Sequence, residues 1–173
     1  GGLASHGGGF AILLALWIYT KRVSKKSYLW ILDKIAAPVA AAGIFIRLGN
    51  LVNSEIVGKE TSLPWGFKFK HHADSLVNMK IVQKDIYWHN VMVRHPSQLY
   101  EALAYLATFI FLLFLYWKRD AVKREGVVFG WFMILVFGAR FLIEFTKEPQ
   151  VTERGEWLLN TGQLLSIPFV LTG

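Results

Sequence analysis

Cysteine is absent from this 173-residue sequence. No disulfide, cysteine nucleophile or cysteine metal site can therefore form within it. Charge is also scarce: charged residues make up 18%, hydrophobic residues make up 54%, and the mean hydropathy is +0.37. A composition this apolar is atypical of a soluble domain and favours a protein that crosses a membrane several times.

Acidic residues are fewer than basic ones, and the excess gives a net charge of +7. Such a charge can indicate a nucleic-acid partner, but here basic residues gather directly after apolar runs. Two short loops contain four each: Lys21, Arg22, Lys25 and Lys26, then Lys118, Arg119, Lys123 and Arg124. Short loops rich in lysine and arginine stay on the cytoplasmic side of a membrane. We therefore predict two cytoplasmic loops and no nucleic-acid partner.

The apolar runs predict transmembrane helices, which need about 20 residues to cross a bilayer. They occupy residues 7–19, 28–48, 96–117 and 127–145, and a last run begins at 157. The first run is short, and its glycines can break it. Pro38 predicts a kink, and Pro96 suits the first turn of a helix. We predict an all-α polytopic membrane protein with four to five transmembrane helices.

Residues 49–95 are polar and rich in turn-forming residues, with no apolar run of spanning length. Alternation of the spans places this segment on the extracytoplasmic side. It is too long for a simple connection, which indicates an ordered functional region. Within it, residues 67–71 alternate between apolar and polar and predict a short strand.

Arg140 and Glu144 lie inside the apolar run 127–145. A spacing of four residues places both on one face of a helix. Charges at membrane depth are costly, so this pair predicts a polar site that faces a cavity lined by protein. The alternative is a structural pair in which the two charges only neutralise each other.

Other polar residues interrupt the pattern at the extracytoplasmic ends of the predicted helices. They are His6, the group Arg47, Asn50, Asn53 and Glu55, and the segment 94–98. Two arginines suit a phosphate group, and a histidine can act as a general base near neutral pH. We therefore expect one pocket for an anionic lipid headgroup. The alternatives are a histidine satisfied at a helix end, an Arg47 that reaches outward to the headgroups, and a simple helix start at His95–Pro96.

Metal ligation is the remaining possibility for the histidines. His71, His72, Asp74 and His89 lie in the long polar segment. Their spacing matches no strong ligand pattern, and solvated loop residues explain them better. We predict no metal and no cofactor.

Taken in order, these segments resemble the prolipoprotein diacylglyceryl transferase family. The similar motifs are His-Gly-Gly at 6–8, Arg-x-Gly-Asn-x-x-Asn-x-Glu-x-x-Gly at 47–58, Leu-Pro-Trp-Gly at 63–66, His-Pro-x-Gln-Leu-Tyr-Glu at 95–101, Arg-x-x-x-Glu-Phe at 140–145 and Gly-Gln-Leu-Leu-Ser-Ile-Pro at 162–168. They cover nearly the whole chain. Because the family has seven spans and this sequence begins with glycine, we expect an excerpt without the N-terminal spans.

Four positions depart from the family pattern. Ile46 stands where the signature has glycine, Leu51 replaces phenylalanine, and Val136 occupies a common tyrosine position. Lys147 replaces an arginine, which keeps the charge but loses the guanidinium fork. None of the four removes a residue of the expected site.

The resemblance implies a catalytic transmembrane domain over residues 1–173 in the bacterial cytoplasmic membrane. It would transfer the diacylglyceryl group of phosphatidylglycerol to the lipobox cysteine at the signal peptide of a prolipoprotein. The expected catalytic residues are His6, Arg140 and Glu144. The expected substrate-binding residues are Arg47, Asn50, Asn53, Glu55 and Gly58.

Two other classes of function stay open at this point. A transporter or lipid-binding protein with a charged site inside the membrane is one alternative, which inverted repeats or broken helices would favour. A purely structural membrane subunit is the other. We find no repeat in the sequence, and a structural subunit would not need two arginines and a histidine at one interface.

The first prediction concerns orientation in the membrane. Single cysteines at Lys25, Lys84 and Lys123 can be probed in intact cells with an impermeant thiol reagent, against a background without cysteine. We expect labelling at position 84 only, because the lysine and arginine asymmetry places the other two in the cytoplasm. Permeabilised cells, in which all three should react, are the control. Labelling at 25 or 123 but not at 84 would reverse the orientation.

Overall fold

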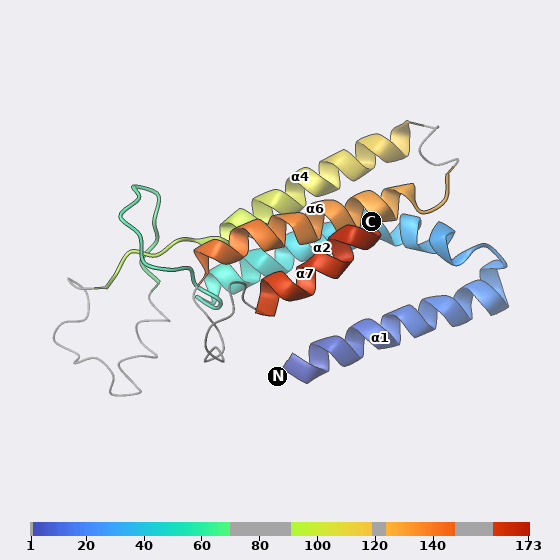
Figure 1. Cartoon of the computed structure of the whole chain (residues 1–173), viewed down its shortest axis with the longest axis horizontal. Coiled ribbons are helices and arrows are strands. Elements are labelled where there is room, and N and C mark those ends of the chain that lie inside the picture. The colour runs from blue at the N-terminus through green and yellow to red at the C-terminus, as the bar shows by residue number, and fades with distance from the viewer. Residues whose placement is uncertain (1, 70–90, 119–123, 148–160) are drawn as a thin grey trace.

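The computed structural model describes residues 2–69, 91–118, 124–147 and 161–173 (Figure 1). Within these ranges the structure describes only the backbone for residues 2–10, 161, 162, 164 and 165. The chain forms the helices α1 (Gly2–Tyr19), α2 (Tyr28–Val52), α4 (Ser97–Trp117), α6 (Val127–Ile143) and α7 (Thr161–Thr172). A π-helical turn (Thr20–Ser24) follows α1, and a 3₁₀ turn (Glu144–Thr146) follows α6.

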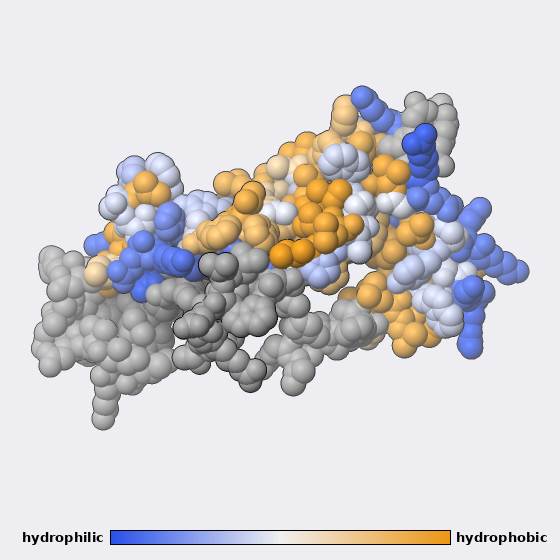
Figure 2. Space-filling view, viewed as in Figure 1, coloured by the Kyte–Doolittle hydropathy of each residue, from blue (hydrophilic) through white to orange (hydrophobic). Residues whose placement is uncertain are grey.

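In the part of the chain that the structure describes, three helices are long and apolar enough to cross a membrane. They are α2, α4 and the continuous stretch Val127–Thr146, with mean hydropathies of 1.7, 1.8 and 1.9. Figure 2 shows the apolar surface of these helices between hydrophilic ends. The predicted helical membrane class is therefore confirmed, and the central spans lie where the sequence predicted them.

The ends of the helices differ from the predicted bounds. The helix α1 runs through its glycines without a break, and α2 continues to Val52, four residues beyond the predicted end. Pro96 lies just before the first residue of α4, as its N-cap. The last helix begins at Thr161, and residues 157–160 lie outside the description.

Small residues on α2 bring the three spans together. Ala36, Ala37 and Ala40 form a buried cluster with Leu112 of α4 and Val128 of α6. One turn further, a Cβ atom on Gly43 would lie 2.9 Å from the ring of Tyr105, so α4 packs directly against the glycine. Small residues permit close approach of helices, which is how membrane helices gain packing energy without a hydrophobic driving force.

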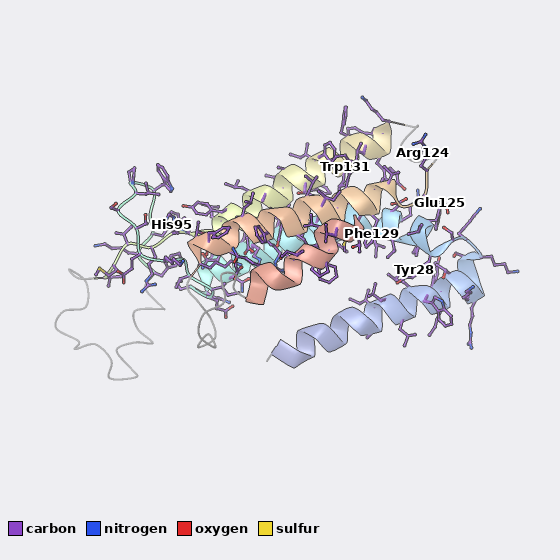
Figure 3. All side chains as sticks on the ribbon, viewed as in Figure 1. Tyr28, His95, Arg124, Glu125, Phe129 and Trp131 are labelled. Atoms are coloured by element: carbon purple, nitrogen blue, oxygen red, sulfur yellow. The ribbon has the colours of Figure 1, made fainter. Side chains whose placement is uncertain are left out.

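A carboxylate joins two helices at the end where the basic loops lie. Asp33 of α2 is buried and accepts hydrogen bonds from the backbone N–H groups of Gly126 (2.7 Å) and Phe129 (2.8 Å). These donors begin α6, and no intrahelical partner exists for the first N–H groups of a helix. Asp33 thus caps α6 from a neighbouring helix instead of reaching toward the headgroups. Figure 3 places Arg124 and Glu125 at this end and His95 at the opposite end.

The described part of the polar segment 49–95, which the sequence predicts to be extracytoplasmic, is held by backbone pairs. Gly58 pairs with Lys147, and Glu60 and Phe67 both pair with Arg94, each as an isolated antiparallel bridge. The strand predicted over 67–71 does not form in its described residues 67–69, because Arg94 is the single partner that Phe67 meets. Residues 70 and 71 lie outside the description.

The helix α1 stands beside the three-helix bundle in Figure 1, antiparallel to α2. A hydrogen bond from the Tyr28 hydroxyl to the Leu13 carbonyl (3.1 Å) connects the two near the basic loop. The apolar side chains of Ile12, Leu14 and Trp17 are exposed. An apolar exposed helix face of this kind suits contact with lipid.

Asp33 generates the second prediction. Asp33→Ala should lower the free energy of unfolding by roughly 3 kcal/mol, since it removes two hydrogen bonds to a charged acceptor and a favourable charge at a helix N-terminus. The measurement is equilibrium unfolding in detergent micelles. Asp33→Asn, which keeps one acceptor oxygen, should lose less. An alanine variant as stable as the wild type would show that water caps α6 equally well.

Candidate functional site

Polar residues from several of the predicted clusters meet at one end of α2, α4 and α6, the end where His95 lies in Figure 3. Arg47 lies in α2, Glu101 in the second turn of α4, and Arg140 in the last turn of α6. Tyr105, also on α4, is buried and interacts electrostatically with all three. Residues separated by more than 90 positions in the sequence thus share one location.

The centre of the cluster is the carboxylate of Glu101, which is fully buried. Its Oε1 accepts a hydrogen bond from Nζ of Lys147 at 2.9 Å. Its Oε2 lies 3.0 Å from Nε of Arg47, although the Nε–H bond does not point at this oxygen as a hydrogen bond requires. A buried carboxylate is costly without cations beside it, and Arg47 and Lys147 provide two.

Lys147 connects a second carboxylate to the first. Its side chain is 5% exposed, and Nζ also donates to Oε2 of Glu144 at 3.1 Å. Arg47, Glu101, Lys147 and Glu144 therefore form one chain of alternating charges with no net charge. Replacement of the family's arginine by lysine at 147 retains a cation that serves two carboxylates.

Arg140 is left outside this chain of charges. Glu144, four residues further along, pairs with Lys147 and not with Arg140. The helix α6 ends at Ile143, and Glu144 lies in a 3₁₀ turn that brings it to the side of Lys147. Among the described residues Arg140 has no carboxylate partner, so the structural pair considered above does not form there.

Asn50 and Glu55 stand together at the end of α2. The Asn50 amide donates to a carboxylate oxygen of Glu55 at 2.8 Å. The chain turns here through Ser54 and Ile56, the two neighbours of Glu55, both with φ of +56°. This conformation is unfavourable for a β-branched residue and is found where the surroundings impose it.

Two buried side chains of α4 impose this turn. Ser97 Oγ donates to the carbonyl of Ile56 at 3.1 Å, and the Gln98 amide donates to the carbonyl of Glu55. Asn53 is exposed, and its described hydrogen bonds are those of its backbone N–H to Gly49 and Leu51. The turn therefore presents Glu55 and Asn50 on a fixed backbone.

Gly58 has a packing role in this arrangement. A Cβ atom there would lie 2.4 Å from the His95 carbonyl oxygen and 2.8 Å from that of Thr146. Only glycine lets the three backbone segments come this close. Gly58 thus allows the polar segment 49–95 to pack against the start of α4 and the end of α6.

The histidines divide into three groups. His95 Nδ1 lies 3.2 Å from the hydroxyl of Tyr100, which accepts a hydrogen bond from Trp65 at 3.0 Å. His6 lies in α1, which runs antiparallel to α2 in Figure 1, and its side chain is not among those that the structure describes. His71, His72 and His89 lie outside the described residues, as does Asp74. Among the residues that are described, no group of three metal-ligating side chains occurs.

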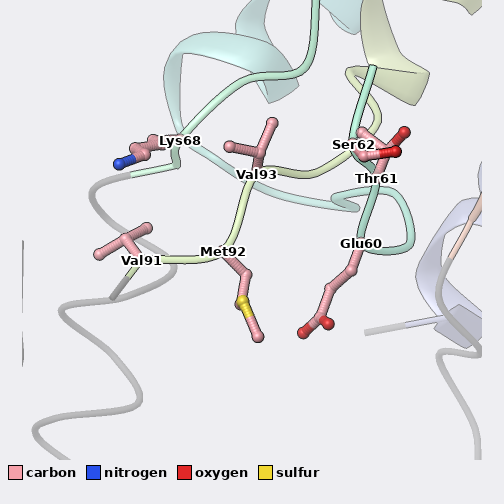
Figure 4. Close-up of a pocket in the computed structure, with 7 residues that line it drawn as sticks. All are labelled: Glu60, Thr61, Ser62, Lys68, Val91, Met92 and Val93. Carbon is pink, nitrogen blue, oxygen red and sulfur yellow. The ribbon is translucent and has the colours of Figure 1, made fainter. Parts of the chain in front are cut away.

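A pocket of about 810 Å³ opens in the polar segment 49–95. It is lined by residues 60–62, Lys68 and residues 91–93 (Figure 4). Glu60 and Met92 extend side by side into it. None of the predicted site residues lines it. Its one acidic and one basic side chain make no described contact with the cluster around Glu101.

Glu101, Lys147 and Tyr105 are the site residues that the sequence analysis did not select. A signal for Glu101 was present, because it is the one charged residue in the apolar run 96–117. Lys147 follows the end of its span, where a basic residue is ordinary, so nothing in the sequence indicates its burial. Tyr105 is one of several aromatic residues in α4 and carries no distinguishing pattern.

Comparison with known proteins identifies the family to which the chain is similar. The model of the family described as prolipoprotein diacylglyceryl transferase matches residues 1–173. A phosphatidylglycerol–prolipoprotein diacylglyceryl transferase of Porphyromonas gingivalis is 48% identical over 182 residues, which cover 100% of this chain and 60% of the relative. A transferase of the same name from Tolumonas auensis is 44% identical over 173 residues, which cover 100% of this chain and 60% of the relative. Another from Bacteroides fragilis is 41% identical over 172 residues, which cover 99% of this chain and 56% of the relative.

The chain thus spans about 60% of the length of these curated relatives. The match includes every motif that carried the resemblance, from His6 to Pro168. The family model covers the whole sequence and several relatives exceed 40% identity, so this chain belongs to the prolipoprotein diacylglyceryl transferase family.

Proposed function

We propose that the protein transfers the diacylglyceryl group of phosphatidylglycerol to the cysteine thiol of a prolipoprotein lipobox. The names of its relatives state the lipid, the acceptor and the group transferred. The observation that carries the proposal is Arg140, a guanidinium without a carboxylate partner among the described residues, beside a chain of charges that is already neutral. Such a group is ready to bind an anionic headgroup at the membrane surface.

The reaction forms a carbon–sulfur bond and breaks a carbon–oxygen bond. The thiolate attacks the glycerol carbon that bears the phosphate, and glycerol-1-phosphate leaves with the bonding electron pair. A free thiol has a pKa of about 8.5, so little thiolate exists at neutral pH. His6 is our candidate to accept the thiol proton. Arg140 and Arg47 bind the phosphate and stabilise the charge that grows on it.

The other predicted residues support these groups in our proposal. Asn50 and Glu55, held by the turn after α2, bind the glycerol hydroxyls of the headgroup, and Asn53 lies beside them on the exposed side. Gly58 keeps this turn against α4. Glu144 acts through Lys147 and not by direct contact with Arg140.

The same proposal places the protein in the bacterial cytoplasmic membrane, with the site at its outer surface. The apolar spans and the basic loops support it. A transporter is less well supported, because α2, α4 and α6 are continuous helices, whereas transporters bind substrate at broken ones.

The third prediction tests the role of Arg140. We expect Arg140→Ala to reduce transfer from phosphatidylglycerol to a lipobox peptide by about 10²- to 10³-fold in the full-length protein. Arg140→Lys should recover only part of the rate, since it keeps the charge but not the fork. Arg124→Ala, an exposed arginine at the opposite end, is the matched control. A fully active Arg140→Ala variant would refute the proposed role.

The fourth prediction concerns His6. His6→Gln keeps a hydrogen-bonding side chain but cannot accept the thiol proton, so the rate at neutral pH should fall by about 10²- to 10⁴-fold. Binding of phosphatidylglycerol should persist. The measurement is the transfer rate against pH, together with lipid binding. If binding is lost along with the rate, His6 is a headgroup ligand or a structural residue.

A further inference from the structure

Glu101 is the buried charged group that the proposed reaction does not yet use. Its side chain has no exposed surface, and it lies between a residue of α2 and a residue that follows α6. A carboxylate that served only to hold helices together would be replaceable by apolar packing, often at no cost in stability. The geometry of its two contacts indicates a more specific use.

The contact with Arg47 leaves most of the guanidinium uncommitted. The contact of Glu101 with the guanidinium is at Nε, at 3.0 Å. A guanidinium has five N–H donors, four of them on the terminal nitrogens. An anion held at that terminal edge would meet a guanidinium whose position is already set by Glu101 on the Nε side. The Arg47 side chain is 12% exposed, so the approach to it is narrow.

The contact with Lys147 controls the other arginine. Lys147 is held by Glu101 at 2.9 Å and holds Glu144 at 3.1 Å. Without Glu101, a buried Lys147 would lose one of its two carboxylates. Glu144 is only four residues from Arg140 and would then be free to pair with it, which would occupy the guanidinium needed for phosphate. Glu101 thus affects Arg47 directly and Arg140 through Lys147 and Glu144.

We propose that Glu101 is a positioning residue for diacylglyceryl transfer: it fixes Arg47 through Nε and anchors Lys147, so that both arginines present unoccupied N–H groups to the phosphate. This inference rests on the proposed function. It assigns to Glu101 no contact with substrate. Its effect is on the placement of the arginines in the transition state, where charge on the leaving phosphate is greatest.

The test is Glu101→Gln in the full-length protein, which keeps the size of the side chain and removes its charge. We expect kcat to fall on the order of 10²-fold, the cost of a small misplacement of catalytic groups. KM for phosphatidylglycerol should not rise, because removing the carboxylate leaves the site more positive. A merely structural role would lower stability or raise KM, so thermal unfolding is measured on the same samples.

A double-variant cycle shows whether Glu101 acts through Arg47. In an Arg47→Lys background there is no guanidinium to orient, so Glu101→Gln should cost much less than it does in the wild type. Equal costs in both backgrounds would overturn the proposal. Glu101→Asp keeps the charge on a shorter side chain and should recover part of kcat. If Glu101→Gln does not fold, Glu101→Asp takes its place in the test. The expected result for Glu101→Asp is a kcat below that of the wild type with an unchanged KM.

Glu60→Gln is the matched control. Glu60 also forms an ion pair with an arginine, at 3.4 Å from Arg94, but its side chain is exposed. This control variant should leave kcat unchanged. Glu101→Gln and Glu101→Asp variants with wild-type kcat would overturn the role of Glu101. An inactive wild type would instead refute the proposed function, so the two failures are distinguishable.

Discussion

A buried carboxylate between two cations is the constraint on which this end of the molecule depends. Glu101 is fully buried, and a buried carboxylate is costly unless cations such as Arg47 and Lys147 lie beside it. These cations belong to α2 and to the segment after α6, while Glu101 belongs to α4. The ion chain therefore sets how the ends of these three helices meet.

The opposite end has its own carboxylate, and the two ends work differently. Asp33 accepts from backbone N–H groups at the start of α6, so it compensates a helix terminus and not a side chain. Between the two ends, alanines and a glycine on α2 give close packing without polar contacts. Because lipid provides little hydrophobic drive for helix association, polar contacts at both ends determine which helices are neighbours.

Much of this architecture was predictable from the sequence, because hydropathy depends on composition along a single segment. The central spans follow from the hydropathy pattern. The polar residues that interrupt this pattern can be picked out in the same way. The pairing of charges does not. Helical spacing relates Arg140 to Glu144, but it contains no information on Lys147, which lies beyond the helix and takes Glu144 as its partner. Glu101 and Arg47 are separated by 54 positions, and only the packing of α2 on α4 brings them together.

The balance of charge at the site explains why an anion would bind there and why its reaction would be favoured. Arg47, Arg140 and Lys147 oppose Glu101 and Glu144, which leaves one positive charge among these buried and half-buried groups. A phosphodiester headgroup carries one negative charge and would neutralise it. In the proposed reaction the phosphate would gain further negative charge as the carbon–oxygen bond breaks, and the arginine donors would interact with it more strongly than with the bound lipid. Interactions that strengthen toward the transition state are those that accelerate a reaction. In this site Glu101 and Glu144 already pair with Arg47 and Lys147. The stronger interaction with the transition state therefore needs no rearrangement of these charges.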